Sequence, residues 1–322
     1  MEKPFKKKTY FALTLDPVHI GTGGYRLGRV DNTIVREPGT NIPKIPGSSI
    51  AGVCRAFTAM TPVVNKYPNC AGKGGEKGED HCGNNTCPVC VGFGFSKGET
   101  NQSFQGLVQF TDTRILFFPV HSMIGPVWIT SESILKEHGI TTANLDNKNK
   151  CKGLGIEIPE NKLNLGWLML ESEGTVALAL NEAFPEIPYH DIKNRGILLS
   201  DKVFSRIVND NLEVRTSVAI DPLTGTAEHS ALFTYEAIPR ATVLWFDVIY
   251  NNPIYFKING QDILLPPRID ILDPLGGTGA IEQISYLAYY VEQGMSYIEA
   301  MGLGGMNTRG FGRTKIIPGG VS

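Results

Sequence analysis

The sequence lacks the features of membrane-spanning and secreted proteins. No uncharged apolar run approaches the ~20 residues that a membrane-spanning helix needs. The N-terminus has neither the apolar core nor the small-residue cleavage site of a signal peptide. We therefore expect a cytoplasmic protein without a membrane partner.

Charge and nucleotide-binding motifs are also scarce. Charged residues make up 19% of the chain, against roughly 25% in an average domain, and the net charge is −2. Bulk charge therefore does not favour polyanion binding. The chain has no Gly-x-x-x-x-Gly-Lys-Ser/Thr run, and its early glycines miss the spacing of a dinucleotide fingerprint. An NTPase and a hydride-transfer enzyme are thus disfavoured.

The distribution of apolar residues predicts a mixed α+β protein. Alternation over residues 9–15 is typical of a strand, and residues 106–120 suggest two paired strands with a turn near Asp112. A helix is expected from an N-cap at Ser48 or Ser49. Two extended runs around a Pro/Gly turn at 221–225 predict a β-hairpin. Interleaved strands and helices favour a ferredoxin-like (RRM-like) core with insertions.

Four of the six cysteines lie close together in the sequence, a pattern that in a cytosolic chain more often binds metal than forms disulfides. The candidate zinc ligands are Cys70, Cys82, Cys87 and Cys90. The last two have the two-residue spacing that suits one tetrahedral zinc ion. His81 could replace Cys82. Since protein groups would fill all four positions, the zinc would be structural, and residues 62–105 would form an insertion held by metal rather than by a core.

Glycine is over-represented, at 36 of 322 residues or about 11%, against a usual ~7%. Besides the turns near the cysteines, glycines form three loops beside basic residues, at 21–24, 47–52 and 302–312. Exposed backbone N–H groups, a helix N-terminus and nearby arginines suit a phosphate chain. Residues 1–60 have an excess of basic residues and residues 151–191 an excess of acidic ones, which predicts a subunit with two electrostatically different faces.

Four motifs, in this order, resemble the RAMP superfamily of CRISPR-associated proteins: PVHIGTG (17–23), IPGSSIAGVCRA (45–56), CPVCVGFG (87–94) and GGMNTRGFGR (304–313). Two further segments are similar to the backbone subunit of type III-B (Cmr) effector complexes: FTDTRILFFPV (110–120) and RTSVAID (215–221). The resemblance covers most of the chain, and it is the joint order that is specific.

The resemblance implies a single RAMP domain over residues 1–322 with a ferredoxin-like palm. Residues 200–240 would supply a thumb helix and a β-hairpin thumb that splays a base out of the guide–target duplex at regular intervals. The implied partners are a crRNA guide, single-stranded target RNA, further copies in a filament and other subunits of a type III complex. The candidate RNA-binding residues are Gly21, Gly23, Ser48, Ser49, Arg55, Arg215, Thr224, Gly304, Gly305, Arg309 and Arg313.

The resemblance also matches Asp31 to the acid that cleaves target RNA, with His19, Tyr235 and Glu236 as candidate helpers. Flipping a base out can bring a 2′-OH into line with the scissile bond. One carboxylate could then hold a divalent ion, Mg²⁺ or Mn²⁺, on the phosphate, or accept the 2′-OH proton. The expected products are a 2′,3′-cyclic phosphate and a 5′-OH.

Simpler readings stay open. Asp31 could be a solvated turn residue, His19 a packing residue of its loop, Glu236 an ion-pair partner, and the arginines merely exposed. At the level of the whole protein, one alternative is a backbone subunit that binds RNA without cutting it. The other is a metal-independent, guide-processing endoribonuclease of the same superfamily with histidine acid/base catalysis.

Overall fold

A computed structural model describes residues 3–23, 30–72, 81–97, 102–141, 144–176, 184–185, 187, 194–268, 272–276 and 281–321. The predicted glycine turns at 74–78 and the glycine at 28 lie outside these residues. Within them, no helix is long and apolar enough to cross a membrane.

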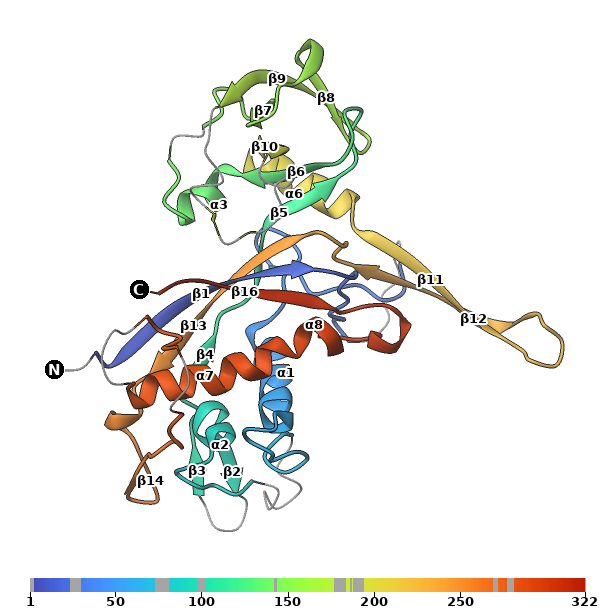
Figure 1. Cartoon of the computed structure of the whole chain (residues 1–322). Coiled ribbons are helices and arrows are strands. Elements are labelled where there is room, and N and C mark those ends of the chain that lie inside the picture. Colours follow the sequence, from blue (N-terminus) through green and yellow to red (C-terminus); the bar gives the residue numbers. More distant parts are fainter. Residues whose placement is uncertain are drawn as a thin grey trace.

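A large sheet runs through the molecule (Figure 1), with the strand order β16-β1-β13-β5-β6-β10-β7-β9-β8 and β4 as an additional partner of β13. Its lower part consists of β1 (Phe5–Thr14), β4 (Val108–Phe110), β5 (Arg114–Val120), β13 (Val243–Asn251) and β16 (Thr314–Val321). All pairings among these strands are antiparallel. Alternating and apolar runs thus form strands as expected, and the predicted mixed α+β class is confirmed.

Helices cover one face of this lower sheet, below it in Figure 1. They are α1 (Gly47–Met60), α7 (Gln283–Ser296) and the short α8 (Ile298–Met301). α1 buries Ile50, Cys54 and Phe57, and α7 turns Leu287 and Val291 into the same core. The chain therefore runs strand, helix, two collinear strands, strand, helix, strand through the lower part, which places both helices on one side.

A second lobe extends the sheet upwards in Figure 1. It contains β6 (Val127–Ser131), α3 (Glu132–Glu137), β7 (Cys151–Leu154), η1 (Pro159–Asn161), β8 (Lys162–Leu165), β9 (Leu168–Val176) and β10 (Gly196–Leu199). From this lobe α6 (Asp201–Asp210) leads into the hairpin β11 (Glu213–Ile220) and β12 (Ala227–Ala237), which projects away from the body of the molecule. The β-hairpin expected from the sequence is therefore present.

The cysteine segment packs beneath the helices, with α2 (Pro88–Phe93), β2 (Phe95–Lys97) and β3 (Gln102–Phe104) at the bottom of Figure 1. α2 is not detached from the core, since Val89 and Val91 are fully buried in the main apolar cluster. The residues after β13 form η2 (Pro253–Tyr255), β14 (Lys257–Ile258) and β15 (Gln261–Asp262). The short helix η3 (Asn307–Arg309) lies elsewhere in the chain, in the last glycine loop. Core packing therefore holds part of this segment, which was expected to be held by metal rather than by a core.

Two local predictions are wrong. Residues 106–120 do not form a strand pair with a turn, because β4 and β5 both pair with β13 and follow each other along it. α1 is not capped by a serine, because Pro46 occupies the N-cap position without a side-chain hydrogen bond. Instead the Asp112 carboxylate, distant in sequence, accepts a hydrogen bond of 2.9 Å from the N–H of Gly47.

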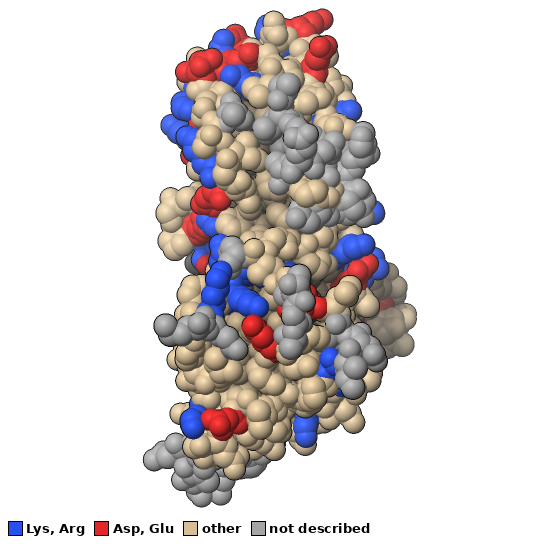
Figure 2. Space-filling view, turned by 60° about the vertical axis from the view of Figure 1, so that its left-hand side comes forward, with Lys and Arg blue, Asp and Glu red and all other residues tan. Residues whose placement is uncertain are grey.

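Several charged residues of the two uneven segments are paired in space. Lys6, Lys7 and Lys8 each form an ion pair with an acid from a distant segment. In the upper lobe Glu171 and Glu173 lie against lysines of residues 150–152. At the top of Figure 2, basic and acidic side chains are accordingly intermixed. The charges of these five side chains are therefore partly neutralised by their partners.

Candidate functional site

Asp31 lies at the base of the hairpin, bound to β12. One carboxylate oxygen, Oδ2, accepts hydrogen bonds from both the backbone N–H and the hydroxyl of Thr234, each at 2.8 Å. The N–H of Asp31 in turn donates to the Thr234 hydroxyl at 2.9 Å. The backbone N–H and the hydroxyl of Thr234 together lower the pKa of Asp31, so the carboxylate is ionised at neutral pH.

The residues after Asp31 continue along β12. Asn32 and Tyr235 form a parallel bridge, and the N–H of Glu236 donates to the Asn32 carbonyl at 3.0 Å. Glu236 is buried, and its two carboxylate oxygens accept from the Arg36 guanidinium at 2.6 Å and the Ile34 N–H at 3.2 Å. This arrangement matches the ion-pair reading of Glu236 and anchors the Asp31 segment to the hairpin.

His19 is buried and also contacts β12. Its Nδ1 lies 2.7 Å from the Glu236 carbonyl oxygen, which in the neutral ring makes Nδ1 the protonated nitrogen. The ring packs edge-on against Tyr235, with centroids 5.6 Å apart. The Nε2 atom faces Gly21, where an added Cβ would lie 3.0 Å from it. All four predicted catalytic residues therefore converge on the base of the hairpin, on β12 or on segments bonded to it.

The last glycine loop closes over this region. The N–H of Gly305 donates to the His19 carbonyl at 3.0 Å, and a Cβ at Gly304 would lie 2.5 Å from that oxygen. Gly304 also has φ +81°, a conformation that strains other residues. Gly21 pairs with Ile34 in an isolated bridge, and Gly23 has φ +75° in an open position. The first and last glycine loops thus meet at the predicted catalytic residues.

Basic side chains border this glycine region. Arg215 stacks over Phe311 at 4.8 Å and pairs with Glu213 at 2.6 Å. Arg313 forms a two-bond pair with Asp16, which leaves its guanidinium anchored, whereas Arg309 is exposed in η3. Of the other predicted RNA contacts, Thr224 lies in the turn at the hairpin tip, and its hydroxyl bonds Asp221 and Thr226.

The start of α1 is considered apart from the glycine loops at the base of the hairpin. Ser48 is exposed and Ser49 half-buried in its first turn. The helix N-terminus already faces the Asp112 carboxylate, which also pairs with Lys44. Because one anion occupies this end of the helix, the geometry does not support the prediction that its N–H groups receive an RNA phosphate.

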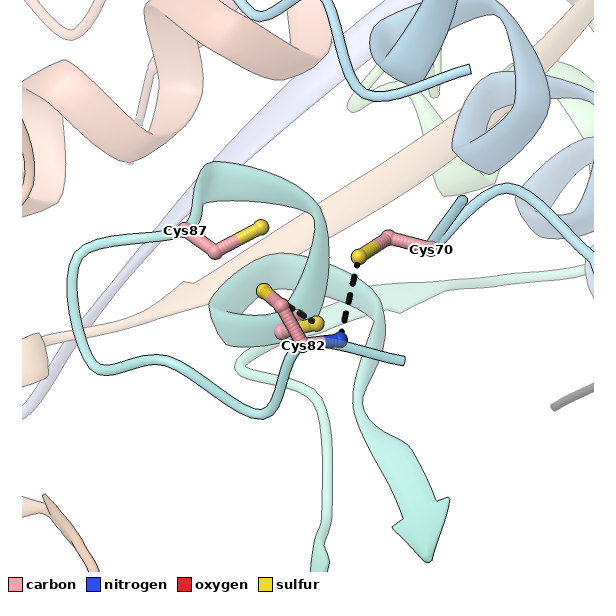
Figure 3. Close-up of side chains that lie close together, drawn as sticks. Cys70, Cys82 and Cys87 are labelled. Atoms are coloured by element: carbon pink, nitrogen blue, oxygen red, sulfur yellow. Dashed lines mark hydrogen bonds between the residues drawn. The ribbon is translucent and has the colours of Figure 1, made fainter. Parts of the chain in front are cut away.

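The four predicted cysteines form a compact cluster, with all sulfur atoms within 4.8 Å of one another. Figure 3 shows the sulfurs of Cys70, Cys82 and Cys87 turned toward a common centre. The Sγ atoms of Cys82 and Cys90 are 3.7 Å apart. Two thiolates on a tetrahedral zinc ion with Zn–S bonds of ≈ 2.3 Å would be about 3.8 Å apart, so this donor set fits zinc.

Arg55 and His81 surround this cluster without joining it. The Arg55 guanidinium donates to the carbonyls of Cys70 at 2.8 Å and Phe93 at 3.3 Å, and lies 3.1 Å from Nδ1 of His81. His81 is not one of the clustered donors, so the structure does not support it as a replacement for Cys82. Arg55 lies in α1, and its guanidinium nitrogens already contact these groups, so the structure does not support the prediction that Arg55 contacts RNA phosphates.

Within the described part of the chain, these cysteines are the one group of three or more His, Cys, Asp or Glu side chains that could hold a metal ion. Asp31 does not belong to such a group among the described residues. A divalent ion at Asp31 would need its remaining ligands from water and from substrate phosphates, which is how Mg²⁺ is usually bound.

Three contributors to the site escaped the sequence-based reasoning: Thr234, Arg36 and Asp112. Each acts on a partner far away in sequence, at separations of 203, 200 and 65 residues. Only Thr234 had a sequence signal, because it directly precedes Tyr235 and Glu236 in the predicted hairpin.

Comparison with known proteins supports the family resemblance that the sequence motifs indicated. The profile of the RAMP superfamily matches residues 12–315. The "CRISPR system Cmr endoribonuclease Cmr4" of Pyrococcus furiosus is 28% identical over 266 residues, covering 74% of this chain and 80% of that protein.

Two solved structures share the fold. Oligomeric Cmr4 from Pyrococcus furiosus has a TM-score of 0.55 at 19% identity, over 98% of both chains. A chain of the type III-B Cmr-beta complex bound to cognate target RNA has a TM-score of 0.60 at 15% identity, over 97% of this chain and 96% of that one. At such identities the likeness establishes the fold of the whole described chain.

Proposed function

The chain belongs to the RAMP superfamily, and on this premise we propose that it is the crRNA-binding backbone subunit of a type III-B CRISPR effector complex that cleaves target RNA. The single observation that carries the proposal is the convergence of Asp31, His19, Tyr235 and Glu236 at the base of a projecting hairpin. The endoribonuclease name of the Pyrococcus furiosus relative supports it. Oligomeric and RNA-bound structures of the same fold support self-assembly and target RNA as a partner.

The palm of this subunit is the ferredoxin-like unit β1-α1-β4/β5-β13-α7-β16. Its strand order β16-β1-β13-β5 and its two helices on one face fit that fold. The thumb is the hairpin β11–β12, whose tip carries Leu223 with 93% of its surface exposed. Exposed apolar side chains on a narrow hairpin can wedge between bases, at the cost of unstacking them.

Guide phosphates contact the joined glycine loops, where backbone N–H groups can approach closely. Arg309 and Arg215 border that surface, with Arg309 exposed and the Arg215 guanidinium stacked on Phe311. Arg313 contributes charge but is held by Asp16. Ser48, Ser49 and Arg55 are left out, because α1 and the cysteine cluster already use that surface.

In target cleavage, splaying a base aligns the 2′-OH of the displaced nucleotide with its scissile phosphate. The 2′ oxygen bonds to phosphorus as the bond from phosphorus to the 5′ oxygen breaks, while water accepts the 2′-OH proton and protonates the leaving 5′ oxygen. Asp31 approaches that phosphate as a carboxylate. Its lowered pKa makes it a weak proton acceptor and a good ligand for a divalent ion, so we favour the second of the two roles considered for it. Mg²⁺ or Mn²⁺, when bound, would neutralise charge developing on the phosphate. Glu236 and His19 hold the segment and Tyr235 rather than touching the reacting atoms.

The cysteine cluster is a structural zinc site, proposed from its four convergent sulfurs. Four thiolates around Zn²⁺ leave a net charge of about −2. Arg55, which interacts electrostatically with Cys90, Cys70 and Cys87, offsets part of it. The site then fixes α2 against α1 at the lower end of the palm.

The test is cleavage of a matched target RNA by the complex assembled on its guide. We expect cuts at regular intervals with Mg²⁺, 2′,3′-cyclic phosphate ends, and loss of cutting in D31N with binding retained. D210N, on the exposed end of α6, is the matched control and should cut normally. Regular cutting by D31N would overturn the catalytic assignment in favour of the binding-only subunit. Metal-independent cutting of guide-repeat RNA by the isolated protein would favour the guide-processing enzyme.

A further inference from the structure

Thr234 links the hairpin to Asp31 through three hydrogen bonds. Its hydroxyl acts in both directions, donating to Oδ2 of Asp31 at 2.8 Å and accepting from the Asp31 N–H at 2.9 Å. Its own N–H supplies the second bond to Oδ2, also at 2.8 Å. Its carbonyl accepts from the Asn32 N–H at 3.0 Å. No other residue among those described makes a hydrogen bond to this carboxylate.

These bonds determine which carboxylate oxygen is available. Oδ2 receives two donors from one residue, so the described contacts leave Oδ1 as the oxygen that can face an RNA phosphate or its metal ion. Thr234 is β-branched and lies within β12, so its hydroxyl has few rotamers. A rigid donor of this kind fixes the direction of the carboxylate as well as its charge.

The same contacts tie Asp31 to the register of the hairpin. Thr234 pairs with Thr216 across β11–β12, and the neighbouring bridge joins Asn32 to Tyr235. A displacement of β12 would therefore move Asp31 with it. If the hairpin inserts into the duplex, the carboxylate travels as part of the inserted element.

We propose that Thr234 is the positioning residue of target cleavage, which orients the Asp31 carboxylate and couples it to the seated hairpin. The inference rests on the proposed function, because it needs Asp31 to act on target RNA. It predicts a defect in the cutting step and not in guide or target binding, since Thr234 acts through Asp31.

The hydroxyl can be removed at almost constant shape. T234V is isosteric and deletes both hydroxyl bonds, whereas T234S keeps them. In the complex assembled on its guide, with target bound to saturation, we expect single-turnover cleavage by T234V to fall about 10- to 100-fold, as for a small misplacement of a catalytic group. T234S should stay within about threefold of the unmodified protein, and target binding should be unchanged in both.

Rescue by the conservative variant separates positioning from mere structural support. T234S keeps the hydroxyl that donates to Oδ2 of Asp31 and accepts from the Asp31 N–H, whereas T234V keeps only the shape of the side chain. A variant that only loosens the fold would lower the amount of assembled complex. A misplaced carboxylate would instead slow cleavage in complexes that assemble and bind target normally.

Four outcomes decide the inference. A slow T234V that assembles and binds target normally, a normal T234S and no added loss in D31N/T234V support it. Normal cutting by T234V, while D31N is inactive, overturns the role of Thr234 and leaves the proposed function standing. Normal cutting by D31N overturns both. If T234V fails to assemble, T234S and T234A differ only in the hydroxyl at equal size, and equal rates for that pair overturn the inference.

Discussion

The ion pair between Arg36 and Glu236 allows a catalytic residue to be distinguished from a structural one. Their side chains are 19% and 10% exposed, and Arg36 Nη2 lies 2.6 Å from Glu236 Oε1. E236A would leave the guanidinium without its carboxylate and the Ile34 N–H without its acceptor. Removing one partner of a buried pair costs about 3–5 kcal/mol, and the residual exposure of both groups favours the lower end, about 3 kcal/mol.

The measurement is thermal unfolding of the purified protein alongside cleavage by the assembled complex. A loss of about 3 kcal/mol corresponds to a fall in Tm of about 4–5 °C, because the entropy of unfolding is ~2.1 cal/mol/K per residue over 322 residues. The matched control is E137A, which breaks the pair with Arg114 whose side chains are 40% and 43% exposed. Such an exposed pair contributes about 0–1 kcal/mol. E137A should therefore leave Tm nearly unchanged.

A double substitution completes the argument. Replacing Arg36 as well, in R36M/E236A, removes the unpaired buried charge, so part of the lost stability should return. Cleavage per assembled complex should fall by much less in E236A than in D31N. A drop as large as that of D31N at unchanged Tm would refute the reasoning and make Glu236 a catalytic residue.

Three further predictions concern the zinc site, the core and the last glycine loop. C87S should reduce bound zinc from about one equivalent to below half, measured by elemental analysis of the purified protein, because the tetrahedral site loses one thiolate. E292A should lower the free energy of unfolding in urea by about 3–5 kcal/mol, because Lys8, only 5% exposed, loses a carboxylate at 2.6 Å; an effect below about 1 kcal/mol would contradict this. G312A should lower Tm, because its φ is +94° and a Cβ would lie 2.5 Å from the Leu303 carbonyl oxygen; an unchanged Tm would mean that the loop adapts.

Local sequence patterns correctly predicted the features that depend on residues close together in the chain. Alternation placed a strand over residues 9–15, and β1 covers Phe5–Thr14. The turn at 221–225 separated two extended runs, and these pair as β11 and β12. The spacing of Cys87 and Cys90 pointed to a shared metal, and four sulfurs lie within 4.8 Å. In each case the signal depends on residues close together in the chain.

Predictions failed for side chains whose hydrogen-bond partners lie far away in the sequence. Ser48 and Ser49 had the right residue type for an N-cap, but the Asp112 carboxylate receives the N–H of Gly47 instead. Arg55 looked like a phosphate contact beside a glycine run, yet it bonds the carbonyls around the cysteine cluster. The hydrogen bonds that a side chain makes depend on its neighbours in space. The local propensity of a residue type contains no information about those neighbours.

The sequence alone determined the class of fold, the hairpin, the cysteine cluster and the motifs that mark the superfamily, because spacing along the chain carries all four. Only the tertiary structure decided which charged side chains remain unpaired and how the Asp31 carboxylate is oriented. The lysines at 6, 7 and 8 are consumed by acids from distant segments, because the sheet and α7 bring them within 3.2 Å. Asp31 is oriented by Thr234, 203 residues away, because the segment after the first glycine loop lies along β12.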